Sequence, residues 1–246
     1  MRWFKKPLVL KFYTTNAGAY QTAKPKPAGS FVPVWWKSLP TKKRKLESIE
    51  SYDMGDYTNM RGCVGMKHMY QYGAVIPMWC DMHVEISQLG TSEYRWRAAD
   101  TTVEVGSHSS GQHNHYWNNH FYQHVKFVSP WHIVCEELTP FMFLDCYWSR
   151  NTQNQYTIPP GIVEYKYQHS AHINTFFSRA HETYSILIEH GQPMVQVVPL
   201  SDRPVKVETY LISPEELTRL VPLTAHRPTF VDLYKHNRRA IEKENQ

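Results

Sequence analysis

Residues 184–198 read Tyr184-Ser-Ile-Leu-Ile188-Glu-His-Gly-Gln-Pro193-Met194-Val-Gln-Val-Val198, and this stretch decides the fold class. Two short apolar runs flank a loop that contains a glycine and a proline. Gly191 can supply a positive φ, and Pro193 can begin a strand without removing a ladder hydrogen bond. The pattern predicts two strands joined by a hairpin turn rather than a helix.

The same pattern recurs along most of the chain as about a dozen short β-rich runs separated by turn residues. It predicts a mainly β protein, a jelly roll or β-sandwich, rather than a parallel α/β sheet. We expect a single domain over residues 1–246. The other predicted strands are 7–13, 74–79, 82–86, 93–97, 101–105, 121–127, 131–135, 141–148, 161–167, 173–177 and 205–210.

Three segments depart from the strand pattern. The proline- and lysine-rich residues 24–45 predict an extended connection. Residues 60–72 carry apolar side chains at helical spacing and predict a short helix ended by Gly73. The segment 213–246 predicts peripheral helices, the first opened by the capping box Ser213-Pro-Glu-Glu216.

Two adjacent tryptophans lie within the proline-rich connection. Trp35 and Trp36 carry large apolar rings, which favour burial. We expect both indoles to pack against the sheet.

Composition bounds the class of protein. The 246 residues are 41% hydrophobic and 14% aromatic, which is typical of an ordered globular chain. The net charge of +5 is mild and comes partly from the run Thr41-Lys-Lys-Arg-Lys45, which predicts a solvated loop, so we do not expect a nucleic-acid partner.

The sequence also bears on location. It shows neither a secretory leader nor an apolar run of the ~20 residues that a membrane-spanning helix needs. The four cysteines are widely separated and predict free buried thiols. We therefore expect a soluble protein made in a reducing cytoplasm, without a membrane partner.

A histidine-rich tract spans residues 108–124 and is the strongest candidate for a metal site, because neutral imidazole is a common ligand of Fe(II) and Zn. The fragment Gly111-Gln-His113-Asn-His115 resembles the first cupin motif, and Pro159-Pro-Gly161 loosely resembles the second. The spacing departs from the cupin pattern in both. The candidate metal ligands are His113, His115, His120, His169 and His172.

The favoured interpretation is instead that these imidazoles are scattered over both faces of a sheet and its edge loop, and that no cofactor is bound. A second metal hypothesis joins His83 and Glu85, which would share a strand face, to His169 or His172. That face is equally where solvent-exposed polar pairs lie.

Several enzyme classes lack their motifs. No Gly-x-Ser-x-Gly elbow is present, and neither type of glycine-rich phosphate loop occurs. The carboxylates Glu136, Glu137 and Asp145 are candidates for a glycosidase pair, but we expect surface carboxylates. The sequence predicts no catalytic residue.

Three stretches carry a resemblance: Ile158-Pro-Pro-Gly-Ile-Val-Glu-Tyr-Lys-Tyr-Gln-His169, Ile173-Asn-Thr-Phe-Phe177 and Gly191-Gln-Pro-Met-Val-Gln-Val-Val-Pro-Leu-Ser-Asp-Arg203. They resemble an uncharacterised family of tailed phages, notably cyanophages and other marine phages, and distantly the DUF6065 type. The likeness runs from about residue 8 to 235. It implies a phage setting and a β-rich domain but transfers no site.

The expected function is therefore a non-catalytic phage-encoded binding or assembly protein, either a virion component or a host-directed factor. Its partner would be a protein: a second copy in a homo-oligomer, or another phage or host protein. Its location would be the host cytoplasm during infection, or the virion. The alternative is a cupin-like metal-dependent enzyme, such as an Fe(II) oxygenase, that uses the histidine-rich segment.

Overall fold

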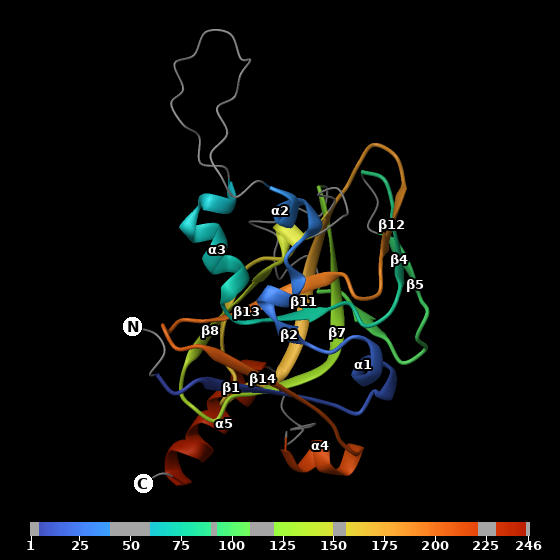
Figure 1. Ribbon diagram of the computed structural model, residues 1–246. Helices are drawn as coiled ribbons and strands as arrows, with labels where there is room; N and C mark the ends of the chain where they lie inside the picture. The colour runs from blue at the N-terminus through green and yellow to red at the C-terminus, as the bar shows by residue number, and fades with distance from the viewer. Residues whose placement is uncertain are drawn as a thin grey trace.

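The computed structural model describes residues 5–39, 60–89, 93–108, 121–149, 156–220 and 230–244, and these are mainly β (Figure 1). The predicted fold class is thus confirmed. The described strands form three sheets, ordered β14-β1-β7-β11-β9 with β6 also on β7, β10-β8-β13-β3-β2, and β12-β4-β5.

The bounds of the strands follow. The largest sheet contains β1 (Leu8–Thr14), β6 (Glu104–Gly106), β7 (Tyr122–Val134), β9 (Tyr156–Thr157), β11 (Ser170–Ser178) and β14 (Val205–Leu211). The second contains β2 (Lys26–Pro27), β3 (Ala74–Pro77), β8 (Pro140–Asp145), β10 (Gly161–Glu164) and β13 (Pro193–Pro199). The third contains β4 (Met82–Ile86), β5 (Tyr94–Ala98) and β12 (Tyr184–Ile188).

The long strand β7 organises the largest sheet, and here the sequence prediction of two strands, 121–127 and 131–135, is wrong. The pairing of β7 with β11 jumps from His172 opposite Val128 to Ser170 opposite His132. Three residues of β7 therefore face one of β11, so that Pro130 lies in a bulge. A proline is tolerated in a strand at such a bulge because no ladder hydrogen bond needs its missing N–H.

One edge of β7 has two partners in succession. Strand β6 pairs with residues 126–128, and β1 pairs with residues 132–134. Strand β1 continues the sheet by running parallel to β14, with Leu8 opposite Val205. Its alternate residues Leu8, Leu10 and Phe12 are fully buried, as expected for a strand with one face on the core. The N-terminal strand is thus held between distant parts of the chain.

The predicted hairpin at residues 189–193 is wrong. Strand β12 pairs with β4, whereas β13 pairs with β3 and β8, so the loop connects two different sheets. The local predictions are confirmed, since Gly191 has φ +80° and Pro193 begins β13. A glycine in this conformation turns the chain without deciding which partner the next strand takes.

The helices are peripheral. The described helices include α1 (Ala17–Thr22), α2 (Val34–Ser38), α3 (Val64–Gln71), α4 (Pro214–Leu220) and α5 (Phe230–Glu244). Helices α2 and α3 lie at one end of the molecule, and α4 and α5 lie at the other (Figure 1). None of the described helices has the length and apolar character needed to cross a membrane.

Two predicted helix signals are confirmed. The Ser213 Oγ accepts from the Glu216 N–H at 3.1 Å, and the Glu216 carboxylate accepts from the Ser213 N–H at 2.8 Å. Gly73, just after α3, has φ +75°.

The two tryptophans of α2 differ: Trp36 is buried against Tyr70 of α3, but Trp35 is exposed. The prediction that both indoles are buried is therefore only half right, because one short helix cannot point neighbouring side chains to one face.

The three sheets contribute to one continuous hydrophobic core, which includes Phe12, Val84, Phe127 and Met194. The cysteines are free, as predicted. Three of them are buried, whereas Cys63, just before α3, is exposed.

Candidate ligand cavity

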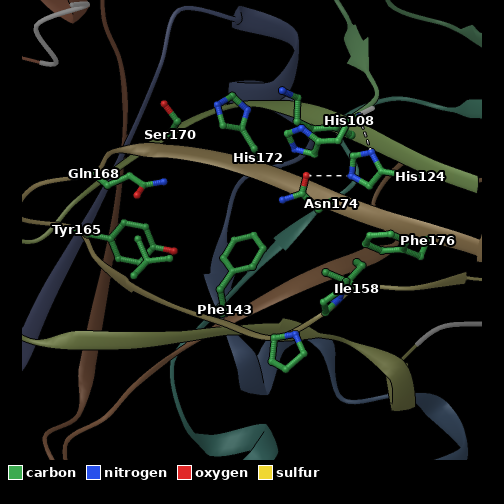
Figure 2. Close-up of a pocket in the computed structure, with 15 residues that line it drawn as sticks. His108, His124, Phe143, Ile158, Tyr165, Gln168, Ser170, His172, Asn174 and Phe176 are labelled. Atoms are coloured by element: carbon green, nitrogen blue, oxygen red, sulfur yellow. Dashed lines mark hydrogen bonds between the residues drawn. The ribbon is translucent and has the colours of Figure 1, made fainter. Parts of the chain in front are cut away.

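A cavity of about 580 Å³ lies between the largest sheet and the β8–β10 side of the second sheet (Figure 2). This volume falls within the range of roughly 300–1,000 Å³ that is typical of small-molecule sites. The lining residues are His108, His124, Lys126, Phe143, Ile158, Pro159, Pro160, Gly161, Val163, Tyr165, Gln168, Ser170, His172, Asn174 and Phe176.

Strand alternation explains why β11 supplies so much of this wall. Its even-numbered residues, Ser170 to Phe176, line the cavity, whereas the odd-numbered Ala171, Ile173 and Phe177 belong to the core. The antiparallel register places His124 opposite Phe176 and Lys126 opposite Asn174. Directly opposed residues share a face of the sheet, so β7 adds an imidazole and an ammonium to the same wall.

His124 is held in one tautomer. Its Nδ1 accepts from the backbone N–H of His108 at 2.9 Å, so the proton must lie on Nε2. That Nε2–H donates to the Asn174 Oδ1 at 3.2 Å (Figure 2). The ring also packs on Phe176 with its centroid 5.0 Å away. Both ring nitrogens of His124 are therefore occupied by protein groups.

Three further imidazoles gather near the bulge of β7. Burial lowers the pKa of His132, with a further lowering from nearby His169, and burial likewise lowers the pKa of His169. Burial is also the main reason that the pKa of His172 falls to about 4, and the charge of Lys126 and two neighbouring imidazoles lower it further. His172 is therefore neutral at pH 7.

Only His172 of these three lines the cavity. The His169 Nδ1–H donates to the Ile133 carbonyl at 3.0 Å, which ties that ring to the backbone. The Nδ1 of His132 is buried and has no hydrogen-bond partner among the described residues. His132 and His169 are thus absent from the described lining, whereas His172 forms part of it.

Tyr165 presents a polar atom to the cavity. Its side chain is fully buried, and its ring packs on Phe141 at 5.5 Å. Burial raises the pKa of the hydroxyl, so it remains protonated. The hydroxyl has no hydrogen-bond partner within the described protein, and Figure 2 shows it directed toward the cavity. A buried hydroxyl without a partner is costly, and a bound ligand would supply one.

The opposite wall is apolar and is fixed by Asp145 at the end of β8. The Asp145 Oδ2 accepts from the backbone N–H of Ile158 at 3.1 Å. This bond orients the Ile158–Gly161 segment, which lines the cavity beside Phe143 and Val163. Asp145, a candidate glycosidase acid from sequence, thus serves as an anchor.

The other two candidate carboxylates lie in ion pairs away from the cavity. Glu136 pairs with Lys11, and Glu137 pairs with Arg203. The expectation of surface carboxylates is confirmed for this pair.

The five candidate metal ligands differ in whether the structure describes them and in whether they line the cavity. His113, His115 and His120 lie outside the described residues, so their prediction stays untested. His169 and His172 both lie beside His132, but only His172 reaches the cavity. Across the described ranges, no group of three or more His, Cys, Asp or Glu side chains is placed to hold a metal ion.

The second metal hypothesis is not supported. His83 and Glu85 do share a face of β4, but His83 is exposed and the Glu85 carboxylate lies 3.8 Å from Arg95. They form the solvent-exposed polar face that was the competing interpretation.

The favoured interpretation of the tract as scattered is corrected for its two ends. His108 and His124 have ring centroids 4.7 Å apart and line the same cavity as His172. Sequence reasoning also missed Lys126, Tyr165 and Asn174 as site residues. The available signal was the alternation His172-x-Asn174-x-Phe176, which marks a second, semi-polar face on a buried strand.

Comparison with protein-family models, with curated proteins and with solved structures finds no match for this chain.

Proposed function

We propose that this protein is a non-catalytic binding protein whose β-sandwich holds a small organic ligand between its sheets. The observation that carries the proposal is the buried Tyr165 hydroxyl, which lies in a cavity of ligand size and has no hydrogen-bond partner among the residues that the structure describes. Apolar walls with a few converging polar groups are the usual composition of a small-molecule site.

A cavity-filling variant tests this proposal. Ser170→Trp introduces a large side chain from the rigid strand β11 into the cavity, and Ser185→Trp makes the same change on the exposed side of β12. The probe is N-phenyl-1-naphthylamine, an uncharged dye that fluoresces when it leaves water. We expect Ser170→Trp to weaken binding at least about tenfold and Ser185→Trp to leave it unchanged.

Circular dichroism and thermal unfolding of both variants control for misfolding. Equal affinity of wild type and Ser170→Trp, with both folded, would contradict the proposal, as would the absence of any binding to the wild type.

The biological setting is a separate proposal that rests on the resemblance to phage proteins. It places the protein in the host cytoplasm or in the virion, with a phage or host protein, or a second copy, as partner. Mass spectrometry of purified particles distinguishes the two locations, and absence from the particles would exclude the virion role.

A further inference from the structure

Three polar side chains of the cavity offer hydrogen-bond donors. The Asn174 Oδ1 accepts from His124, so the Asn174 side chain offers its Nδ2 donors. The Tyr165 hydroxyl, which is protonated and has no partner in the described part of the chain, is a second donor, and the Lys126 ammonium is a third. A ligand that matches this set must bring acceptor oxygens.

The charged side chain in the described wall of the cavity is positive. Lys126 is the cation of the described wall, and no Asp or Glu lies among the lining residues that the structure describes. Glu164 lies in sequence between the lining residues Val163 and Tyr165, but it is not part of the lining. Its carboxylate accepts a hydrogen bond from the Tyr234 hydroxyl of α5. An ammonium beside an apolar cavity favours an anion, because the field is poorly screened where water is excluded.

The apolar walls are suited to a flat part of a ligand, such as an aromatic ring. Phe143 lies apart from Ile158 and Phe176, which lie near each other (Figure 2), and Pro159 and Pro160 complete the apolar lining. Aromatic rings pack well on such surfaces in offset or edge-to-face arrangements.

We propose that the cavity is selective for a small aromatic organic acid, whose anionic group lies at Lys126 and whose ring lies between Phe143 and Phe176. This inference rests on the proposed function, that the cavity takes an organic ligand, and adds the chemical class of that ligand.

A matched pair of probes tests the inference. 8-Anilinonaphthalene-1-sulfonate carries the ring system of N-phenyl-1-naphthylamine with one added sulfonate, so the difference in their affinities isolates the anion. We expect wild type to bind the sulfonate at least about fivefold more tightly than the neutral dye, and less so as salt is raised.

Lys126→Met keeps the aliphatic stem and removes the charge. We expect it to reduce the affinity for the sulfonate about five- to tenfold, with the neutral dye unchanged. Lys67→Met, on the exposed face of α3, makes the same change in net charge away from the cavity. It should change neither affinity. Tyr165→Phe should weaken sulfonate binding by a smaller factor, about threefold.

The outcomes separate the two proposals. Equal binding of both dyes that Lys126→Met does not change, while Ser170→Trp removes both, would overturn the inference and leave the proposed function standing. Sulfonate binding that survives Ser170→Trp would place the anion elsewhere and overturn the inference. Failure of wild type to bind either dye would overturn the proposed function itself.

Discussion

His172 is a half-buried imidazole whose pKa of about 4 lies well below its usual range. Partial burial is the main cause, because it removes water that would stabilise an imidazolium, and the charge of Lys126 and the neighbouring imidazoles lower the pKa further. The same ring is neutral at pH 7 and presents a polar edge to the cavity. An uncharged imidazole at this place can contact the apolar part of an organic ligand, beside the ligand's anionic group.

The pKa of His172 makes stability depend on pH. It is about 4 in the folded protein, against about 6.5 in an unfolded chain, so the unfolded chain binds the proton first as pH falls. The contribution of the neutral imidazole to the free energy of unfolding is complete above about pH 6.5 and is lost as the pH falls from 6.5 to 4. It amounts to about 3 kcal/mol, because one pKa unit corresponds to roughly 1.4 kcal/mol.

His172→Gln should therefore flatten the fall in unfolding free energy over that interval, as measured by urea unfolding at a series of pH values. His181→Gln, at an exposed position, is the control. Identical pH profiles for wild type and His172→Gln would show that this imidazole is not responsible.

The Tyr165 hydroxyl predicts an unusual response to deletion. Tyr165→Phe removes a buried polar atom that has no described protein partner, so the unliganded protein should lose no stability and gain up to about 1 kcal/mol. Tyr156→Phe is the matched control, because the buried Tyr156 hydroxyl accepts from Gln192 Nε2 at 2.8 Å. That variant should lose about 1–2 kcal/mol in the same urea titration. A larger loss for Tyr165→Phe than for Tyr156→Phe would mean that the Tyr165 hydroxyl has a partner in the folded protein.

At the scale of elements, local sequence signals predicted strands and helix ends well. The capping box of α4, the positive φ of Gly73 and the alternation of β1 depend on neighbouring residues, which is why the sequence contains them. Partner choice is different. Nothing between residues 188 and 193 states that the two flanking strands join different sheets. That outcome depends on which distant strands the two segments pair with, namely β4 for β12, and β3 and β8 for β13.

The bulge in β7 shows the same limit. Pro130 is a correct local sign that a regular ladder stops, and it favours two separate strands. Strand β11 pairs with β7 on both sides of the bulge and keeps the strand continuous. The bulge also places His132 and His172 beside each other, and bulges are frequent next to functional sites.

Gly73 joins α3 to β3 and passes close to the backbone of β13. A Cβ at this position would come within 1.9 Å of the Val197 carbonyl oxygen, and φ is +75°. Gly73→Ala should therefore cost more than about 3 kcal/mol, by clash as well as by backbone strain. Gly191→Ala has φ +80° but open space around the added methyl, and should cost about 1 kcal/mol. Equal losses in urea unfolding would contradict the close approach of Gly73 to the β13 backbone.

At the scale of the whole molecule, the sequence predicted the class of fold but not the site. The candidate cavity joins residues of β7, β8, β10 and β11, which are brought together only by long-range pairing. Histidine abundance drew attention to residues 113–120, whereas Lys126, Tyr165 and Asn174 have nothing unusual in their sequence context. What singles them out is their place in the lining of the cavity and the absence of a carboxylate from its described wall.

The binding hypothesis also predicts the metal content. Protein purified without an affinity tag should hold less than about a tenth of an equivalent of Fe, Zn or Mn, because a structural or catalytic site would bind close to one. Inductively coupled plasma mass spectrometry measures this directly. A stoichiometric metal would favour the cupin-like enzyme and a role for His113, His115 and His120.

The most direct test of the central claim is a methyl NMR titration of the wild-type protein with N-phenyl-1-naphthylamine. If the ligand enters between the sheets, the methyl signals of Ile158 and Val163 shift in a saturable manner, while those of Val84 and Ile86 in the third sheet stay in place. Val34, which is 81% exposed next to the exposed Trp35, would report binding of the dye to the apolar surface of α2 instead. Shifts at Val34 with Ile158 and Val163 unchanged would contradict the account.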